Sequence, residues 1–330
     1  MDDSLSKVEW REKALQEQIF AWQKLIFSEV GSTALQNGNV NPQEVLSPLF
    51  DRLRRLYIDD FPLARLKATS DLIIHAEDST ANTDAPQLRA VNWLGRTVRT
   101  QFTKLAAAAL PVSDSIALNL AKHAQWGITG LVPGSMYMGF ALERPEAPRG
   151  FEESDKRAYD LIVDAARSVS IVPQFVGQDG VNSELAEAIT DPSLRDAAMM
   201  AALHLSPTKA SAFDSVEIYA PGGANGTLHL RERVALRHAL IKPMMRQKKE
   251  GTFVGELNEI DLDSSRFQLR NISQVGTLRC VMEFSREHAR HWLGQRVKVT
   301  GIFDTDLTGR PRLMRVNNIE VLDEQSSLKI

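Results

Sequence analysis

Basic side chains are concentrated in one stretch of the sequence, between residues 231 and 249. This stretch has one acidic residue, Glu232, and seven basic ones: Arg231, Arg233, Arg237, Lys242, Arg246, Lys248 and Lys249. Arginine and lysine bind phosphate groups, and the apolar residues between them can face a core. We therefore expect a phosphate ligand, if there is one, to bind at Arg237, Lys242, Arg246, Lys248 and Lys249. A solvated helix between two domains is the alternative interpretation.

A second group of arginines, Arg266, Arg270 and Arg279, lies in segments where polar and apolar residues alternate. Successive side chains of a strand point to opposite faces, so the arginines are predicted to lie on the outer face of a sheet. The inward positions are then Phe267, Leu269, Leu278, Cys280, Met282 and Phe284. Exposed guanidinium groups on such a face could bind nucleic acid or a protein partner, although the face lacks the exposed aromatic rings typical of single-strand binders.

The candidate for acid–base chemistry is His75, on a predicted strand close to Glu77 and Asp78. A histidine paired with a carboxylate can transfer protons. His288 and His291 are three residues apart, but no further ligands complete a metal set. The glycines around residues 134–139 and 222–226 lack the residues of a nucleophile elbow or a phosphate-binding loop. We predict no metal and no cofactor, and the sequence favours a protein that is not an enzyme.

The bulk composition is that of an ordinary globular protein, with 43% hydrophobic residues, 25% charged residues and a net charge of −3 over 330 residues. This charge argues against a protein that coats nucleic acid along its whole surface. The single cysteine, Cys280, excludes an internal disulfide and fits a reducing compartment. The acidic N-terminus does not resemble a secretory signal, and no apolar run is long enough to cross a bilayer. We expect a cytoplasmic location.

Residues 1–246 are predicted to form a helix-rich body of α/β or α+β class with a mixed sheet. An apolar stripe indicates a first helix from Leu5 to Val30, ended by Gly31, which packs on its own domain or mediates homo-oligomerisation. A later helix, 86–109, has a basic face that we interpret as solvated: Arg89, Arg96, Arg99 and Lys104. Further helices are expected at 41–57, 113–126, 154–168, 191–205 and 231–242, and strands at 70–76, 135–142, 171–176, 213–220 and 227–230. Residues 146–150 read as an exposed linker that could subdivide the body.

From Lys248 onward the apolar period changes from 3.6 to 2, which indicates strands. The predicted order is strands at 252–261, 266–270 and 277–284, a helix at 286–293, and strands at 296–303 and 312–322. This order resembles the oligonucleotide/oligosaccharide-binding (OB) fold, a five-stranded barrel, over residues 247–330; an SH3-like barrel is the competing fold. The resemblance implies a ligand face on the second and third strands and the adjoining loops. Asp304 and Asp306, in the last of these loops, are expected to repel phosphate.

We therefore interpret the chain as a binding or adaptor subunit whose barrel engages a protein partner or nucleic acid. One alternative is a nucleic-acid-processing enzyme with a dispersed active site in the body. Another is a self-assembling accessory protein of a bacterial defence or mobile-element system. No membrane association is expected.

Overall fold

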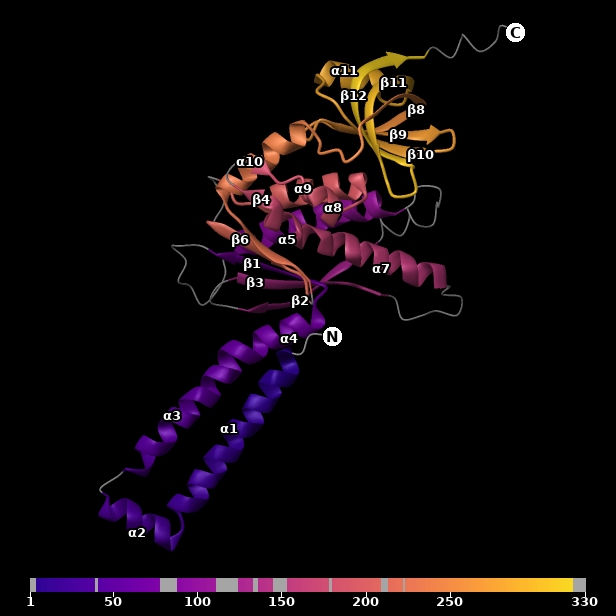
Figure 1. Ribbon diagram of the computed structural model, residues 1–330. Helices are drawn as coiled ribbons and strands as arrows, with labels where there is room; N and C mark the ends of the chain where they lie inside the picture. Colours follow the sequence, from indigo (N-terminus) through magenta and orange to yellow (C-terminus); the bar gives the residue numbers. More distant parts are fainter. Residues whose placement is uncertain are drawn as a thin grey trace.

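The computed structural model describes residues 4–38, 41–77, 88–110, 124–132, 136–144, 153–177, 180–208, 213–221 and 223–322. Three parts follow one another in space: a helical arm, a body of one sheet covered by helices, and a small barrel (Figure 1). The chain belongs to the α+β class. The linker expected at residues 146–150 and most of the helix expected at 113–126 lie outside the described residues.

The arm is a hairpin formed by α1 (Ser4–Ile26), α2 (Glu29–Asn37) and α3 (Pro42–Arg55). A π-helical turn (Leu56–Asp60) and α4 (Phe61–Thr69) join the arm to the sheet. The prediction that Gly31 ends the first helix is wrong, because α1 ends at Ile26 and Gly31 lies inside α2. A Cβ at Gly31 would lie 1.9 Å from the carbonyl oxygen of Leu25, so glycine permits the sharp corner between α1 and α2. Asn41 caps α3 by accepting a hydrogen bond from the Gln43 backbone N–H at 3.0 Å.

The body contains a five-stranded sheet in the order β2-β3-β1-β6-β7. Its strands are β1 (Leu72–Glu77), β2 (Trp126–Val132), β3 (Met136–Leu142), β6 (Ser215–Tyr219) and β7 (Asn225–Leu228). The mixed sheet expected from the sequence is wrong, because every neighbouring pair runs antiparallel. The strand expected at 171–176 is also wrong: a short 3-10 helix, Val172–Phe175, occupies most of it and follows another at Ser168–Ser170. In the described residues, β4 (Val176–Gly177) pairs with β5 (Gly180–Val181) and not with the five-stranded sheet.

Helices cover one face of this sheet: α5 (Leu88–Ala109), α7 (Glu153–Arg167), α8 (Leu185–Ala188), α9 (Pro192–Leu205) and α10 (Leu230–Ile241). Leu72, Ile74 and Met138 point from the sheet into the core beneath these helices. Twelve of the fourteen residues of α9 are buried, because this helix lies between the rest of the body and the barrel (Figure 1). Its alanine side chains are small, so neighbouring elements can pack closely against α9 on all sides.

The C-terminal part is a closed barrel of five strands in the order β10-β12-β11-β8-β9. The strands are β8 (Lys249–Asp261), β9 (Arg266–Ile272), β10 (Gly276–Val281), β11 (Arg296–Thr305) and β12 (Pro311–Val321), with α11 (Arg286–Trp292) after the third. β10 and β12 pair in parallel, and the other pairs are antiparallel. Phe267, Leu269, Leu278 and Cys280 are buried in the barrel core, as their alternation predicted, with Met282 and Phe284 packed against it.

Candidate functional site

The barrel is fixed to the body by ion pairs from the first half of α9. Asp191 caps this helix with Oδ1, which accepts from the backbone N–H groups of Ser193 and Leu194, and its Oδ2 accepts from Arg312 Nε of the barrel at 2.9 Å. One turn later, Arg195 donates to Asp304 Oδ2 at 2.9 Å, and both side chains are buried. These pairs hold the two parts in a defined relative position.

Asp196 completes the attachment by binding two barrel arginines. Arg266 donates to both carboxylate oxygens, at 2.7 and 2.8 Å, and Arg279 Nε donates at 2.7 Å. Burial would raise the pKa of Asp196, but the charges of the two arginines outweigh burial and lower the pKa to about 2. Arg266 and Arg279 do point out of the barrel, yet α9 covers them, so the expectation that both guanidinium groups lie free on an outer face is wrong.

Asp304 also differs from its expected role. The carboxylate is buried and accepts from Arg195 and from the backbone N–H groups of Arg246 and Gln247 at 2.8 and 2.9 Å. It therefore presents no free charge that would repel phosphate. Asp306 is occupied within its own loop, where Oδ1 accepts from the backbone N–H groups of Thr308 and Arg310.

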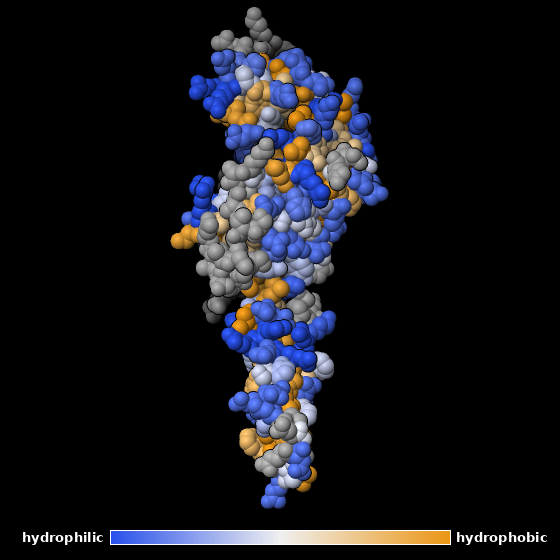
Figure 2. Space-filling model, turned by 90° about the vertical axis from the view of Figure 1, so that its left-hand side faces the viewer, coloured by the Kyte–Doolittle hydropathy of each residue, from blue (hydrophilic) through white to orange (hydrophobic). Residues whose placement is uncertain are grey.

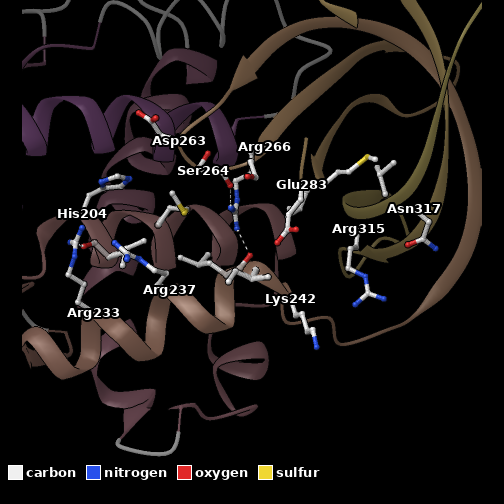
Figure 3. A pocket seen from close by; sticks show the side chains of 18 residues that line it. His204, Arg233, Arg237, Lys242, Asp263, Ser264, Arg266, Glu283, Arg315 and Asn317 are labelled. Atoms are coloured by element: carbon white, nitrogen blue, oxygen red, sulfur yellow. Dashed lines mark hydrogen bonds between the residues drawn. The ribbon is translucent and has the colours of Figure 1, made fainter. Parts of the chain in front are cut away.

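Beside this attachment, the surface is hollowed into a groove formed by two adjoining cavities. One, of about 800 Å³, lies along α5, and the other, of about 730 Å³, lies between α10 and the barrel; His204, Arg233 and Asp263 line both. In Figure 3, Arg233 and Arg237 extend beside His204 on one side, and Glu283, Arg315 and Asn317 lie on the barrel side. We call this continuous depression the junction groove.

The junction groove is basic. Its lining has three acidic side chains, Asp261, Asp263 and Glu283, and eight basic ones: Arg89, Arg96, Lys104, Arg233, Arg237, Lys242, Arg266 and Arg315. Lys104 neutralises Asp261 at 2.6 Å, and Arg266 is bound to Asp196.

Five of the eight cations have no carboxylate partner among the described residues: Arg89, Arg96, Arg237, Lys242 and Arg315. Arg233 is instead fixed at the end of α9, where it donates to the carbonyl oxygens of Leu203 and Ser206. A groove with this excess of free positive charge attracts polyanions.

His204 lies where the two cavities meet. Burial lowers the pKa of this imidazole, and the nearby charges of Lys104 and Arg233 lower it further. The ring is therefore neutral at pH 7, and the positive charge of the groove comes from its arginines and lysines.

Two uncharged residues of α5 complete the lining. Trp93 is the one Trp, Tyr or Phe among the described residues of the groove; it is half-buried and packs on Phe213, with ring centroids 5.9 Å apart. Gln101 is only 4% exposed, and its Oε1 accepts no hydrogen bond within the described part of the chain. An aromatic ring and an unsatisfied amide thus lie among the cations.

The predicted binding residues outside the Asp196 cluster divide into three groups. Arg237 and Lys242 line the junction groove, whereas Lys248 and Lys249 are exposed outside it. Arg246 pairs with Glu187 at 3.1 Å and Arg270 with Glu259 at 3.5 Å. The sequence did not single out Trp93, Gln101, His204 or Arg315, and it assigned Arg89 and Arg96 to a solvated face.

The candidate catalytic residue His75 lies on the opposite face of the sheet from the core helices. Its Nδ1 is 3.3 Å from Glu217 Oε2 of β6, and its ring stacks on Tyr137 at 3.8 Å. The expected neighbour Glu77 instead lies within hydrogen-bond distance of Ser215, at 3.4 Å. His75 Nε2 is buried and has no partner in the described residues, so the free ring nitrogen is shielded from solvent.

Within the described ranges, no group of three or more histidine, cysteine or acidic side chains could hold a metal ion. None of the helices described is long and apolar enough to span a membrane. No family model, curated protein or solved structure matches the chain. The site is therefore interpreted from its own geometry and chemistry.

Proposed function

We propose that this chain is a nucleic-acid-binding protein without catalytic activity, and that the junction groove holds a phosphodiester backbone. The observation that carries the proposal is a set of five cations that line one continuous groove and have no carboxylate partner within the described ranges: Arg89, Arg96, Arg237, Lys242 and Arg315. Guanidinium and ammonium groups without internal partners bind phosphate and release counterions on doing so. Phosphates spaced along a chain suit cations spaced along a groove.

We further infer that the barrel is of the OB type. The inference is supported by the pairing of the first strand with the second and fourth, and by the parallel pairing of the third with the fifth. Barrels of this type bind ligands on the second and third strands. Here Arg266 and Arg279 of those strands bind Asp196, and we therefore propose that the ligand binds beside this face, in the junction groove.

A salt titration tests the proposal. With five phosphate contacts, the slope of log K against log salt concentration for a single strand is expected to be about −3.5. Replacing Arg237 and Lys242 with glutamine should make the slope less steep by about 1.4 and weaken binding at low salt. Lys248→Gln with Lys249→Gln is the matched control, since it removes two exposed charges outside the groove. Equal effects of the two double variants, or no binding by the wild type, would refute the assignment of the groove.

A second role is favoured by the arm, which we propose joins two copies of the chain. Trp10, Phe20, Phe27 and Val30 are 68–83% exposed, and Figure 2 shows hydrophobic side chains interspersed along the arm. A hairpin of two helices encloses little core, and a second identical hairpin would complete a four-helix bundle. Residues 4–60 contain seven basic and eight acidic side chains, a balance that suits self-association better than binding to a polyanion.

The oligomeric state tests this second role. Light scattering of the full chain should give a dimer, and Phe20→Glu with Phe27→Glu should give a monomer with unchanged nucleic-acid affinity per chain. Exchanging the exposed Leu307 of the barrel for glutamate is the control and should leave the dimer intact. A wild-type monomer at micromolar concentration would exclude the dimer.

A further inference from the structure

We propose that the junction groove selects unpaired, single-stranded nucleic acid by stacking one base on the Trp93 indole. This inference rests on the proposed function and adds the class of nucleic acid and the residue that selects it.

The first support is the position of Trp93 on α5. Arg89, Trp93 and Arg96 are spaced by four and three residues, so they lie on one face of the helix. The two arginines are about 10 Å apart along the helix axis, and neither has a carboxylate partner in the described chain. An aromatic ring between two free guanidinium groups matches a strand that carries a phosphate on each side of every base.

The second support is the fixed setting of the indole. Trp93 packs at 45° on Phe213, which is buried in the core, while the exposed part of Trp93 lines the groove. A ring already held in place loses little conformational entropy when a base stacks on it. Such stacking is tolerant of base identity because every base has a π face.

The third support is Gln101, two helical turns beyond Trp93 in the same cavity. This side chain is buried, and its Oε1 has no hydrogen-bond partner in the described residues. A buried amide left without a partner destabilises the fold unless a ligand or water supplies the missing hydrogen bond. The edge of an unpaired base offers donors and acceptors that an amide can bind.

A duplex does not offer these contacts. Its bases are stacked on one another and paired, so neither a flat face nor a Watson–Crick edge is free for Trp93 or Gln101. A duplex could bind only through its phosphates, and its affinity would depend on salt without depending on the indole.

The experiment measures fluorescence anisotropy of labelled 12-nucleotide DNA with the full chain. The probes are a single strand, the corresponding duplex and a strand whose central residues are abasic. Trp93→Leu should weaken single-strand binding about ten-fold while leaving the salt slope and duplex affinity unchanged. Trp93→Phe should restore most of the affinity, and Leu307→Ala, at an exposed position of the barrel outside the groove, should have no effect.

The abasic strand gives a readout that does not depend on the folding of a variant. Wild-type protein should bind the abasic strand about as weakly as Trp93→Leu binds the intact one. The inference is overturned if the duplex binds as tightly as the single strand at the same salt concentration, or if Trp93→Leu binds both strands like the wild type. If either result is accompanied by a steep salt slope, the proposal that the groove binds phosphates is still supported. Absence of binding to every probe would instead remove the proposed function.

Discussion

Replacing Asp196 with alanine tests how the barrel is attached to the body. The substitution leaves two guanidinium groups in a buried interface, since the side chains of Arg266 and Arg279 are only 7% and 12% exposed. Removing one partner of a buried ion pair costs about 3–5 kcal/mol. Arg266 keeps its hydrogen bonds to the carbonyl oxygens of Leu240 and Ser264, which places the expected loss near the lower end, at about 3 kcal/mol.

Urea unfolding at pH 7, followed by circular dichroism, measures this loss as a lower free energy of unfolding. Asp263→Ala is the control, because Asp263 is exposed and its removal should change stability by less than about 0.5 kcal/mol. A combined variant, Asp196→Leu with Arg266→Met and Arg279→Met, should recover most of the lost stability, since no charge is then left unpaired. If Asp196→Ala unfolds within about 1 kcal/mol of the wild type, the reasoning is refuted.

Three further predictions concern acid stability, a helix corner and the cysteine. The pKa of Asp196 is lowered from 3.8 to about 2. The ionised carboxylate therefore adds about 2 kcal/mol to the free energy of unfolding above pH 4, and this contribution is lost as the pH falls to 2. Urea unfolding across this pH range should show the loss, and the Asp196→Asn variant should depend less on pH. Gly31→Ala should lower the melting temperature because its Cβ would meet Leu25, whereas Gly95→Ala in α5, with open space around it, should stabilise slightly. Burial raises the pKa of the Cys280 thiol, so a thiol reagent should label it only in denaturant; labelling of the folded chain would show that the barrel opens.

The barrel strands were predictable because strict alternation indicates strands and identifies their inward side chains, but the boundaries were not exact, since the third strand ends at Val281 and not at Phe284. Phe267 and Leu269 had to share one face, and the turn at residues 263–265 could only separate two strands. The body was less predictable. Its strands are short, and β2 contains Gly127 and Gly130, which weaken the strand pattern of the residues between them. Pairing direction is set by contacts between distant segments, so an antiparallel sheet could not be distinguished from a mixed one.

The junction groove was also predictable only in part. Arg237 and Lys242 were found because basic residues are dense around them, and density is a local property. Trp93 and Arg315 are far apart in the sequence and come to line one groove only when α5 and β12 pack on α9. The burial of Arg266 depends on Asp196, and there the sequence does contain a signal. Two adjacent charged residues in an otherwise alanine- and methionine-rich helix indicate partners from elsewhere in the fold.

When two parts of a protein separate, an interface held by ion pairs behaves differently from one held by leucine side chains. Separating the barrel from α9 would return the carboxylates of Asp191 and Asp196 and the guanidinium groups paired with them to water, which solvates them well. For this reason, we expect that dividing the chain near residue 246 destabilises the two parts less than removing one carboxylate destabilises the intact molecule. Removing the carboxylate of Asp196 alone, in contrast, leaves two guanidinium groups without their anion in a largely buried interface.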